Sequence, residues 1–235
     1  MSGIQQVMMS GGIGGPYGFI YAGTHISAQA GTDPGTGLPL VADVKSGSWL
    51  VNNFVLTSDG KFDSVVAYNG DGEVGTIVSK SGIASFSPMN PFSAEGWFEN
   101  GEAVCSIAVG SGYPSIVADF TQSNSPQGIS ATIVRSVSEG VFTYVSTGLI
   151  SDPPGYLRSG GAFNHFVLSF DGATLRAAVC GKIVASLACA PLNATPSVQF
   201  STGGSVGSGP KKIDELLLCS RPRTADFVPP IVPFE

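Results

Sequence analysis

The sequence predicts an all-β fold, a sandwich of short strands with extended ends, and three observations lead to it. Turn-forming residues occupy 48 of the 235 positions, as 32 Gly and 16 Pro, which is too many for long helices. Between these turns lie short runs of β-branched and aromatic residues, as in strands. No window of a dozen residues keeps a helical period without Gly or Pro, apart from a single turn at 224–227.

Composition and charge exclude several classes of protein. Hydrophobic residues make up 43% of the chain, which is too apolar for intrinsic disorder. The net charge is −6, and no basic cluster is present to neutralise phosphates, so we exclude nucleic-acid binding as the main function. No run of about 18 apolar residues occurs, so membrane insertion is not expected.

The two ends of the chain differ from its middle. Residues 1–44 predict a Gly-rich N-terminal arm, because Gly11–Pro16 and Gly31–Gly37 are linker-like. The apolar residues suited to docking on a partner are Ile4, Val7, Met8, Met9, Ile13, Phe19 and Ile20. A tail without fixed structure is the alternative. The arm carries no Lys or Arg, so no cleaved signal peptide is expected. Three prolines in residues 229–235 predict an extended C-terminal tail.

The sandwich itself is expected over residues 45–228. Its early strands are bounded by Gly, Pro, Asn or Ser. They are Gly101–Val109, Ser115–Phe120, Ile129–Val137 and Val141–Ser146. In the last of these, Phe142 and Tyr144 share one face while Val141 and Val145 share the other. Apolar residues on both faces predict a strand that is covered on both sides.

The later strands give the most specific pattern. Residues Phe163–Leu187 predict a three-stranded meander, because apolar residues alternate along three runs separated by Asp171-Gly172 and Cys180-Gly181. Residues Lys212–Arg221 follow as a final strand, with the two carboxylates of Asp214-Glu215 near its start.

These segments resemble the laminin-G-like branch of the concanavalin A-like lectin/glucanase superfamily. Members of that branch carry a strand that starts with Trp and His, two Asp-Gly turns and a closing Ile-Asp-Glu strand, after an opening strand with a central Trp. The residues here that match this pattern are Trp97, Phe163, His165, Asp171, Gly172, Gly181, Asp214 and Glu215. The resemblance covers roughly residues 46–227. It implies a two-sheet antiparallel jelly-roll sandwich, in which this set of residues is structural.

The resemblance also implies individual roles. It implies that His165 packs or hydrogen-bonds within a sheet, and that one carboxylate of Asp214-Glu215 accepts backbone N–H groups from a neighbouring loop. Two positions depart from the family pattern, since Phe163 replaces Trp and Cys180 replaces the second Asp. The second turn still forms if Gly181 adopts a positive φ.

Enzymatic activity is not expected. Hydrolases of the superfamily carry a Glu-x-Asp-x-x-Glu motif that places two acids on one strand face at the spacing needed for retaining chemistry. That motif is absent, and the nearest cluster, Glu95, Glu99 and Glu102, has unsuitable spacing. We therefore predict neither catalytic nor cofactor-binding residues.

The sequence also gives little support for a metal site or for reactive cysteines. Asn69, Asp71 and Glu73 alternate in a Gly-rich loop and are weak calcium candidates, but no bidentate Glu follows, which favours a solvated turn. The chain has four cysteines, Cys105, Cys180, Cys189 and Cys219. They form no C-x-x-C pair, so we expect free, mostly buried thiols, with one disulfide as the alternative.

A structural or binding role in a bacteriophage particle fits these observations. The start of the sequence, Met1–Gln6 followed by a Gly-rich arm, is similar in character to structural proteins of tailed phages. We expect a capsid-decoration or tail-associated subunit of the virion, assembled in the host cytoplasm, with other virion subunits or copies of itself as partners. The alternative is a lectin-like module that binds host surface glycans. Aromatic residues available for sugar stacking are Trp49, Tyr113, Tyr144 and Tyr156.

Overall fold

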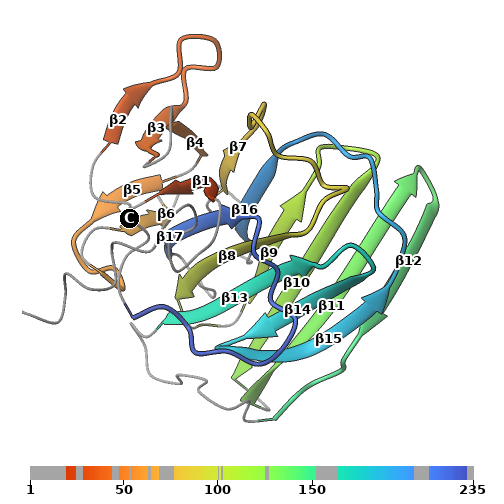
Figure 1. Cartoon of the computed structure of the whole chain (residues 1–235). Coiled ribbons are helices and arrows are strands. Elements are labelled where there is room, and N and C mark those ends of the chain that lie inside the picture. Colours follow the sequence, from red (N-terminus) through yellow and green to blue (C-terminus); the bar gives the residue numbers. More distant parts are fainter. Residues whose placement is uncertain are drawn as a thin grey trace, which may run out of the picture.

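The computed structural model describes residues 20–24, 29–43, 48–52, 54–62, 65–68, 77–99, 101, 103–124, 127–151, 163–203 and 212–231. This part of the chain consists of seventeen strands joined by turns and loops (Figure 1). It contains no helix, and hence none that could cross a membrane. The prediction of an all-β fold is confirmed.

The strands form two antiparallel sheets. The first has eight strands in the spatial order β15-β14-β13-β8-β17-β6-β5, with β1 paired to the second half of β17. Its strands are β1 (Ile20–Thr24), β5 (Phe54–Thr57), β6 (Val65–Tyr68), β8 (Phe92–Glu99), β13 (Phe163–Phe170), β14 (Thr174–Val179), β15 (Lys182–Ala188) and β17 (Lys212–Cys219). The predicted meander is β13-β14-β15.

The second sheet has nine strands in the order β12-β11-β10-β9-β16-β7-β4-β3-β2. Its strands are β2 (Gln29–Thr32), β3 (Pro39–Ala42), β4 (Ser48–Asn52), β7 (Ile77–Lys80), β9 (Ala103–Val109), β10 (Ser115–Asn124), β11 (Gln127–Ser138), β12 (Val141–Ser146) and β16 (Val198–Gly203). The two sheets pack face to face (Figure 1), so the predicted two-sheet sandwich is also confirmed.

Aromatic rings fill the space between the sheets. Phe166 of β13 stacks on Phe120 of β10 with ring centroids 4.6 Å apart. Trp49 of β4 packs against Phe200 of β16 at 5.9 Å. All four side chains are fully buried. Burial of one such side chain contributes about 1.5–3 kcal/mol to folding. The stacking of Phe166 on Phe120 therefore helps to hold the two layers together, whereas Trp49 and Phe200 belong to the same nine-stranded sheet.

The outer faces of the two sheets differ. In β8 and β13 almost every residue is buried, whichever face it occupies. In β9, β10 and β11 buried residues alternate with partly exposed ones, the pattern of a sheet with one solvated face. The difference arises because residues 220–231, which we call the C-terminal strap, cross the outer face of the eight-stranded sheet (Figure 1).

The N-terminal region departs from the predicted arm. β1 pairs with β17, and β3 pairs with β4, so the boundary predicted at residue 44 follows strands that already belong to the sheets. Ala22 and Val41 are fully buried in the core. Ile20, one of the apolar residues expected to dock on a partner, packs instead against Leu217 and Cys219 of β17. Residues 1–19, which contain the first Gly-rich stretch, lie outside the described residues.

The C-terminal region shows one correction. The single helical turn predicted at 224–227 is absent, because Arg223 and Phe227 are both bonded to the sheet beneath them and the chain between them is irregular, with a bend at Ala225. Residues 229–231 continue the strap without regular structure. The rest of the predicted tail, 232–235, is not among the described residues.

Candidate functional site

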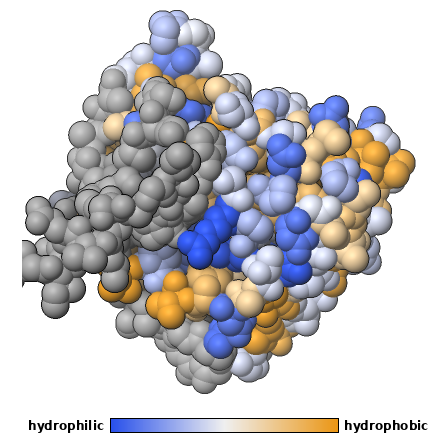
Figure 2. Space-filling model, in the orientation of Figure 1, coloured by the Kyte–Doolittle hydropathy of each residue, from blue (hydrophilic) through white to orange (hydrophobic). Residues whose placement is uncertain are grey.

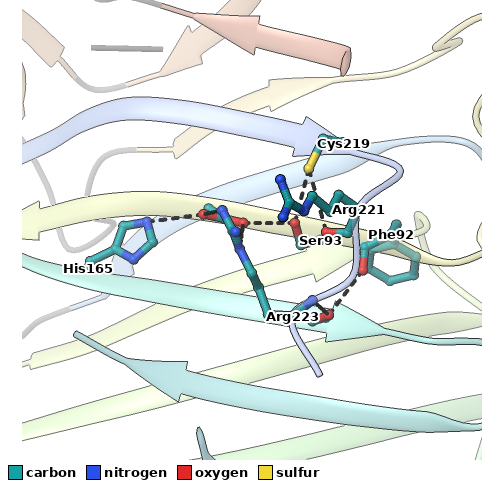
Figure 3. Close-up of polar contacts among 8 residues, drawn as sticks. Phe92, Ser93, His165, Cys219, Arg221 and Arg223 are labelled. Carbon is teal, nitrogen blue, oxygen red and sulfur yellow. Dashed lines mark hydrogen bonds and ion pairs between the residues drawn. The ribbon is translucent and has the colours of Figure 1, made fainter. Parts of the chain in front are cut away.

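A buried ion-pair cluster lies between the eight-stranded sheet and the strap. Side chains alternate along β8, so Glu95 points away from the sandwich core, toward the strap. Arg223 of the strap donates two hydrogen bonds to this carboxylate, from Nε to Oε1 at 2.7 Å and from Nη2 to Oε2 at 3.0 Å. His165 of β13 places Nε2 3.4 Å from Oε2. Figure 3 shows His165 and Ser93 on opposite sides of the carboxylate, with Arg223 reaching it from the strap.

Glu95 stays ionised although it is completely buried. Burial by itself would raise the pKa of this carboxyl, but the nearby imidazole of His165 and the hydrogen bonds and charge of Arg223 outweigh burial and lower the pKa to about 2. Ser93 Oγ adds a hydrogen bond to Oε1 at 2.8 Å. Such a carboxyl is too acidic to donate a proton near neutral pH, and both of its oxygens are engaged. The cluster is therefore suited to holding the strap rather than to acid catalysis.

Aromatic packing supports the same contact. The ring of Phe227 stands edge-on to His165, with centroids 5.9 Å apart. The guanidinium of Arg223 lies 4.6 Å from the centre of the Phe227 ring, in cation–π contact. The backbone N–H of Arg223 also donates to Ser169 Oγ at 2.7 Å. The guanidinium of Arg223 and the ring of Phe227 in the strap thus cover Glu95 and His165.

The strap is fastened again where it reaches the far end of the sheet. Phe227 N donates to the carbonyl of Gly181 at 2.8 Å. The carboxylate of Asp226 accepts from Ile183 N at 3.0 Å and pairs with Lys182 at 2.9 Å. The bond from Lys182, followed by that from Ile183, lowers the pKa of Asp226. These contacts fix the direction in which the strap crosses β8, β13 and β15.

Trp97 and Phe163 lie in a second, smaller apolar cluster on this outer face, together with Val65. Phe62 stands edge-on to Trp97, with centroids 5.9 Å apart. The ammonium of Lys61 lies 4.8 Å from the Trp97 ring. Phe163 thus contributes to a packing cluster in the position where the resembling family has Trp.

Asp214 accepts backbone hydrogen bonds, the role that the resemblance implied for one carboxylate of this pair. Its Oδ2 receives Lys61 N at 2.6 Å and Phe62 N at 3.2 Å, and its Oδ1 receives Glu215 N at 2.9 Å. Glu215 has φ 43°, and the pairing of β17 with β8 shifts by one residue there, which marks a β-bulge. Both carboxylates are buried in this structural arrangement.

The remaining predicted motif residues form the two turns of the meander. Asp171 Oδ1 accepts the N–H groups of Ala173 and Thr174, so it closes the first turn with its side chain, and Gly172 has φ 101°. In the second turn both Cys180 (φ 47°) and Gly181 (φ 84°) have positive φ, as a two-residue type I′ hairpin requires. The Cys for Asp replacement therefore leaves the turn intact.

Of the acidic cluster Glu95, Glu99 and Glu102 and the weak calcium candidates, the structure describes only Glu95 and Glu99. Glu99, at the end of β8, lies 3.3 Å from Lys212, away from the buried Glu95. Glu102 and the weak calcium candidates Asn69, Asp71 and Glu73 are outside the described residues. Within the described ranges no group of three His, Cys, Asp or Glu side chains could hold a metal ion.

The four cysteines are free. Cys105 and Cys219 are buried, whereas Cys180 and Cys189 are partly exposed. Burial raises the pKa of the Cys219 thiol, and the negative charge of Glu95 raises it further. Burial likewise raises the pKa of Cys105. Both buried thiols are therefore protonated at neutral pH and are poor nucleophiles.

The aromatic residues considered for sugar stacking occupy different environments. Trp49 is fully buried in the core, so its proposal as a sugar-stacking residue was wrong. Tyr113 is 58% exposed in the loop before β10, and Tyr144 is 64% exposed on β12. Tyr156 lies outside the described residues.

Strand β12 presents an exposed apolar surface. It is the last strand of the nine-stranded sheet, and within the described part of the chain only β11 pairs with it. Phe142 is 57% exposed, and its ring centroid lies 6.2 Å from that of Tyr144. Val141 is 56% and Val137 is 42% exposed. Figure 2 shows apolar surface where the β11–β12 hairpin lies in Figure 1.

We call Val137, Val141, Phe142 and Tyr144 the apolar edge. The prediction that this strand is covered on both sides was wrong, because β12 is an edge strand and the outer face of its sheet is solvated. The error has a physical reason. A sequence with apolar residues on both faces is typical of a strand buried on both sides, but it is equally consistent with a surface kept apolar for contact with a partner.

The open face beside the apolar edge carries small polar side chains. The strand register places Phe142 beside Ser136, which in turn lies beside Ser115. Further along the face, Ser106 Oγ donates to Asp119 Oδ1 at 2.5 Å. An aromatic border next to a shallow hydroxyl-rich surface is chemically suited to binding, and it was not recognisable from the sequence because register is a tertiary property.

No protein-family model matches the sequence, and no curated protein matches it. Among solved structures, it is similar to the binding domain of botulinum neurotoxin serotype G, with a TM-score of 0.56 and 8% identity over 86% of this chain and 48% of that one. The binding domain of botulinum neurotoxin DC in complex with SialylT gives 0.51 and 12% over 83% and 47%. A Trypanosoma rangeli sialidase in complex with 2,3-difluorosialic acid gives 0.50 and 13% over 86% and 31%.

These similarities establish the fold alone, because the identities are low. The chain spans about half or less of the length of these structures. Two of the three are binding domains and one is a sialidase, so the fold occurs both in binding domains and in an enzyme. The function of this chain therefore has to be argued from its own surface.

Proposed function

We propose that the chain is a non-enzymatic structural and binding subunit that attaches to its partner through the apolar edge. The observation that carries this proposal is the exposure of Phe142 and Tyr144 on an unprotected edge strand. Exposed apolar patches on folded domains mark interaction sites, because leaving aromatic surface in water is unfavourable. An edge strand also offers backbone N–H and C=O groups for pairing.

The buried cluster supports the non-enzymatic part of the proposal. Glu95 and His165 are an acid and an imidazole in contact, a pair that could serve in acid–base catalysis, but both are fully buried beneath the strap. A substrate could reach them only if the ion pair to Arg223 broke. Attachment of the strap explains the geometry of Glu95 and His165 without an enzymatic role for either residue.

We place this subunit on a bacteriophage particle, as a capsid decoration or a tail-associated protein of the virion. Support comes from the character of the N-terminal sequence and from the four free cysteines, which suit assembly in a reducing cytoplasm. The partners would be other virion subunits or copies of this chain. The open sheet and its apolar edge would be the surface through which they assemble.

Incorporation into particles tests the proposal. We expect the double variant F142D/Y144D to lower the copy number of the chain in purified particles at least tenfold, measured by quantitative mass spectrometry. The matched control is V55D, because Val55 is also exposed, at 41%, on the edge strand β5 of the other sheet. Normal incorporation of the F142D/Y144D variant, or absence of the wild-type chain from particles, would contradict the proposal.

Glycan binding is a second candidate, favoured by the exposure of Tyr113 and Tyr144 near the hydroxyl-rich face. Sugar rings stack on exposed aromatic side chains, and Asp119 with Ser106 provides hydrogen-bonding groups on that face. The neurotoxin domain solved in complex with SialylT has a related fold. A glycan array with sialylated and neutral glycans tests this candidate. Binding that is lost in Y144A and retained in V55A would support it, and a blank array would exclude it for the glycans displayed.

A further inference from the structure

We infer that two copies of this chain pair through β12, antiparallel and centred on Thr143, so that their nine-stranded sheets join into one continuous sheet. This inference rests on the proposed function, because it names the partner of the apolar edge. It is carried by the composition of the strand, by its self-complementary register and by the surface that pairing would cover.

The composition of β12 leaves its edge unprotected. Natural edge strands avoid pairing through Lys, Pro, inward charges or bulges. The run Val141–Ser146 contains no charged residue and no Pro, and four of its residues are apolar. In the described part of the chain, one side of this strand pairs with β11 and no strand pairs with its other side. The backbone is therefore available to a second strand.

The register follows from symmetry. If a twofold axis joins two sheets with their outer faces on the same side, residues facing each other must belong to the same face. Centring the axis on Thr143 places Phe142 opposite Tyr144 of the second copy, and Val141 opposite Val145. Centring it on either neighbour would place each ring opposite its own copy or opposite a small residue. Of these three registers, only the one centred on Thr143 places both aromatic rings of each copy opposite an aromatic ring of the other copy.

Charge and area are consistent with this partner. No charged side chain lies on the paired stretch, so the twofold axis brings no like charges together. Phe142 and Tyr144 are 57% and 64% exposed, and aromatic side chains bury about 150–250 Å² each, so the four rings would cover on the order of 400–500 Å². This is less than the roughly 1,200 Å² of a specific, stable interface, which predicts a weak, concentration-dependent dimer in the micromolar range.

A charge swap at the centre tests the register itself. Thr143 is exposed and would face Thr143 of the second copy, so T143K and T143E should each repel themselves while attracting each other. We expect sedimentation equilibrium of the full chain, up to about 200 µM, to show a wild-type dimer, weakening of at least tenfold for each single variant, and recovery in their equimolar mixture. V55K on β5 should dimerise like the wild type. Circular dichroism melting checks that all variants are folded.

Two results would overturn the inference. One is a wild-type chain that stays monomeric across this concentration range. The other is a mixture of T143K and T143E that associates no better than either alone. The proposed function fails separately, since F142D/Y144D could abolish incorporation into particles while the wild-type chain is monomeric. In that case the apolar edge binds a different subunit and self-pairing is excluded.

Discussion

Arg223 in the C-terminal strap donates two hydrogen bonds to Glu95 in the central strand β8, although the two residues are 128 positions apart in the sequence. In this bidentate geometry, Nε and Nη2 of the guanidinium each donate to a different carboxylate oxygen. Bidentate pairs of this kind are among the strong hydrogen-bonded ion pairs in proteins. Because Glu95 is fully buried, this contact joins the end of the chain to the middle of the sheet.

Removing the charge of Glu95 should destabilise the fold strongly. Glu95→Gln leaves Arg223 of the strap without its ionic partner, and breaking a buried pair in this way costs about 3–5 kcal/mol of unfolding free energy. Urea denaturation measures the loss. Glu99→Gln is the matched control at the partly exposed end of the same strand, with an expected cost of about 0–1 kcal/mol. Equal costs for the two variants would show that the ion pair does not fasten the strap.

The same residue should make stability depend on pH in the acid range. The pKa of Glu95 in the folded chain is about 2, against an ordinary value of 4.5, so folding favours the ionised form. Its contribution is therefore complete above about pH 4.5 and is lost as the pH falls toward 2, with a total of about 3 kcal/mol. We expect the difference in unfolding free energy between wild type and Glu95→Gln to shrink over that window. A difference that stays constant from pH 6 to pH 2.5 would contradict the assignment.

Substitutions at two glycines with positive φ distinguish the cost of backbone strain from the cost of a steric clash with the strap. A Cβ at Gly181 would lie 2.0 Å from the carbonyl oxygen of Phe227, whereas a Cβ at Gly172 would meet nothing within 4 Å. Gly172→Ala should cost only the strain of its φ, about 1 kcal/mol. Gly181→Ala should cost clearly more and should increase proteolysis of the strap. Thermal melting with limited proteolysis compares them, and similar behaviour of the two variants would mean that the strap does not rest on Gly181.

A polar bridge across the core predicts a coupling energy. Asn164 Nδ2 on β13 donates to Gln122 Oε1 on β10 at 2.8 Å, so the bond joins the two sheets. Asn164→Leu and Gln122→Leu should each cost about 1–3 kcal/mol, because each removes one partner of a buried bond. The double variant should cost about 1 kcal/mol less than the sum of the two. Additive costs in a double-mutant cycle would show that this bond does not couple the sheets.

The sequence was informative wherever local chemistry decides the structure. The turns at Asp171-Gly172 and Cys180-Gly181 were recognisable because each needs a particular residue type at a particular φ. The bounds of β12 were predicted to the residue, since turn residues flank a short β-branched and aromatic run. In the same way, abundant Gly and Pro with interrupted apolar runs excluded long helices.

The candidate sites depended on contacts that no local pattern contains. Nothing near Glu95 in the sequence indicates that Arg223 will cover it, and nothing near Trp49 shows that its side chain belongs to the core while Tyr144 is exposed. The N-terminal residues were read as an arm because they cannot form a core alone, yet β1 completes a sheet beside β17.

The sequence by itself thus determined the fold class, the turns and most strands, because backbone preferences and side-chain alternation act over a few residues. Only the tertiary structure decided which sheet face is covered and which is open, and hence which residues are available to a partner. The physical reason is that burial depends on segments distant in the chain. The strap removes Glu95 and His165 from solvent, while the edge position of β12 leaves Phe142 and Tyr144 exposed.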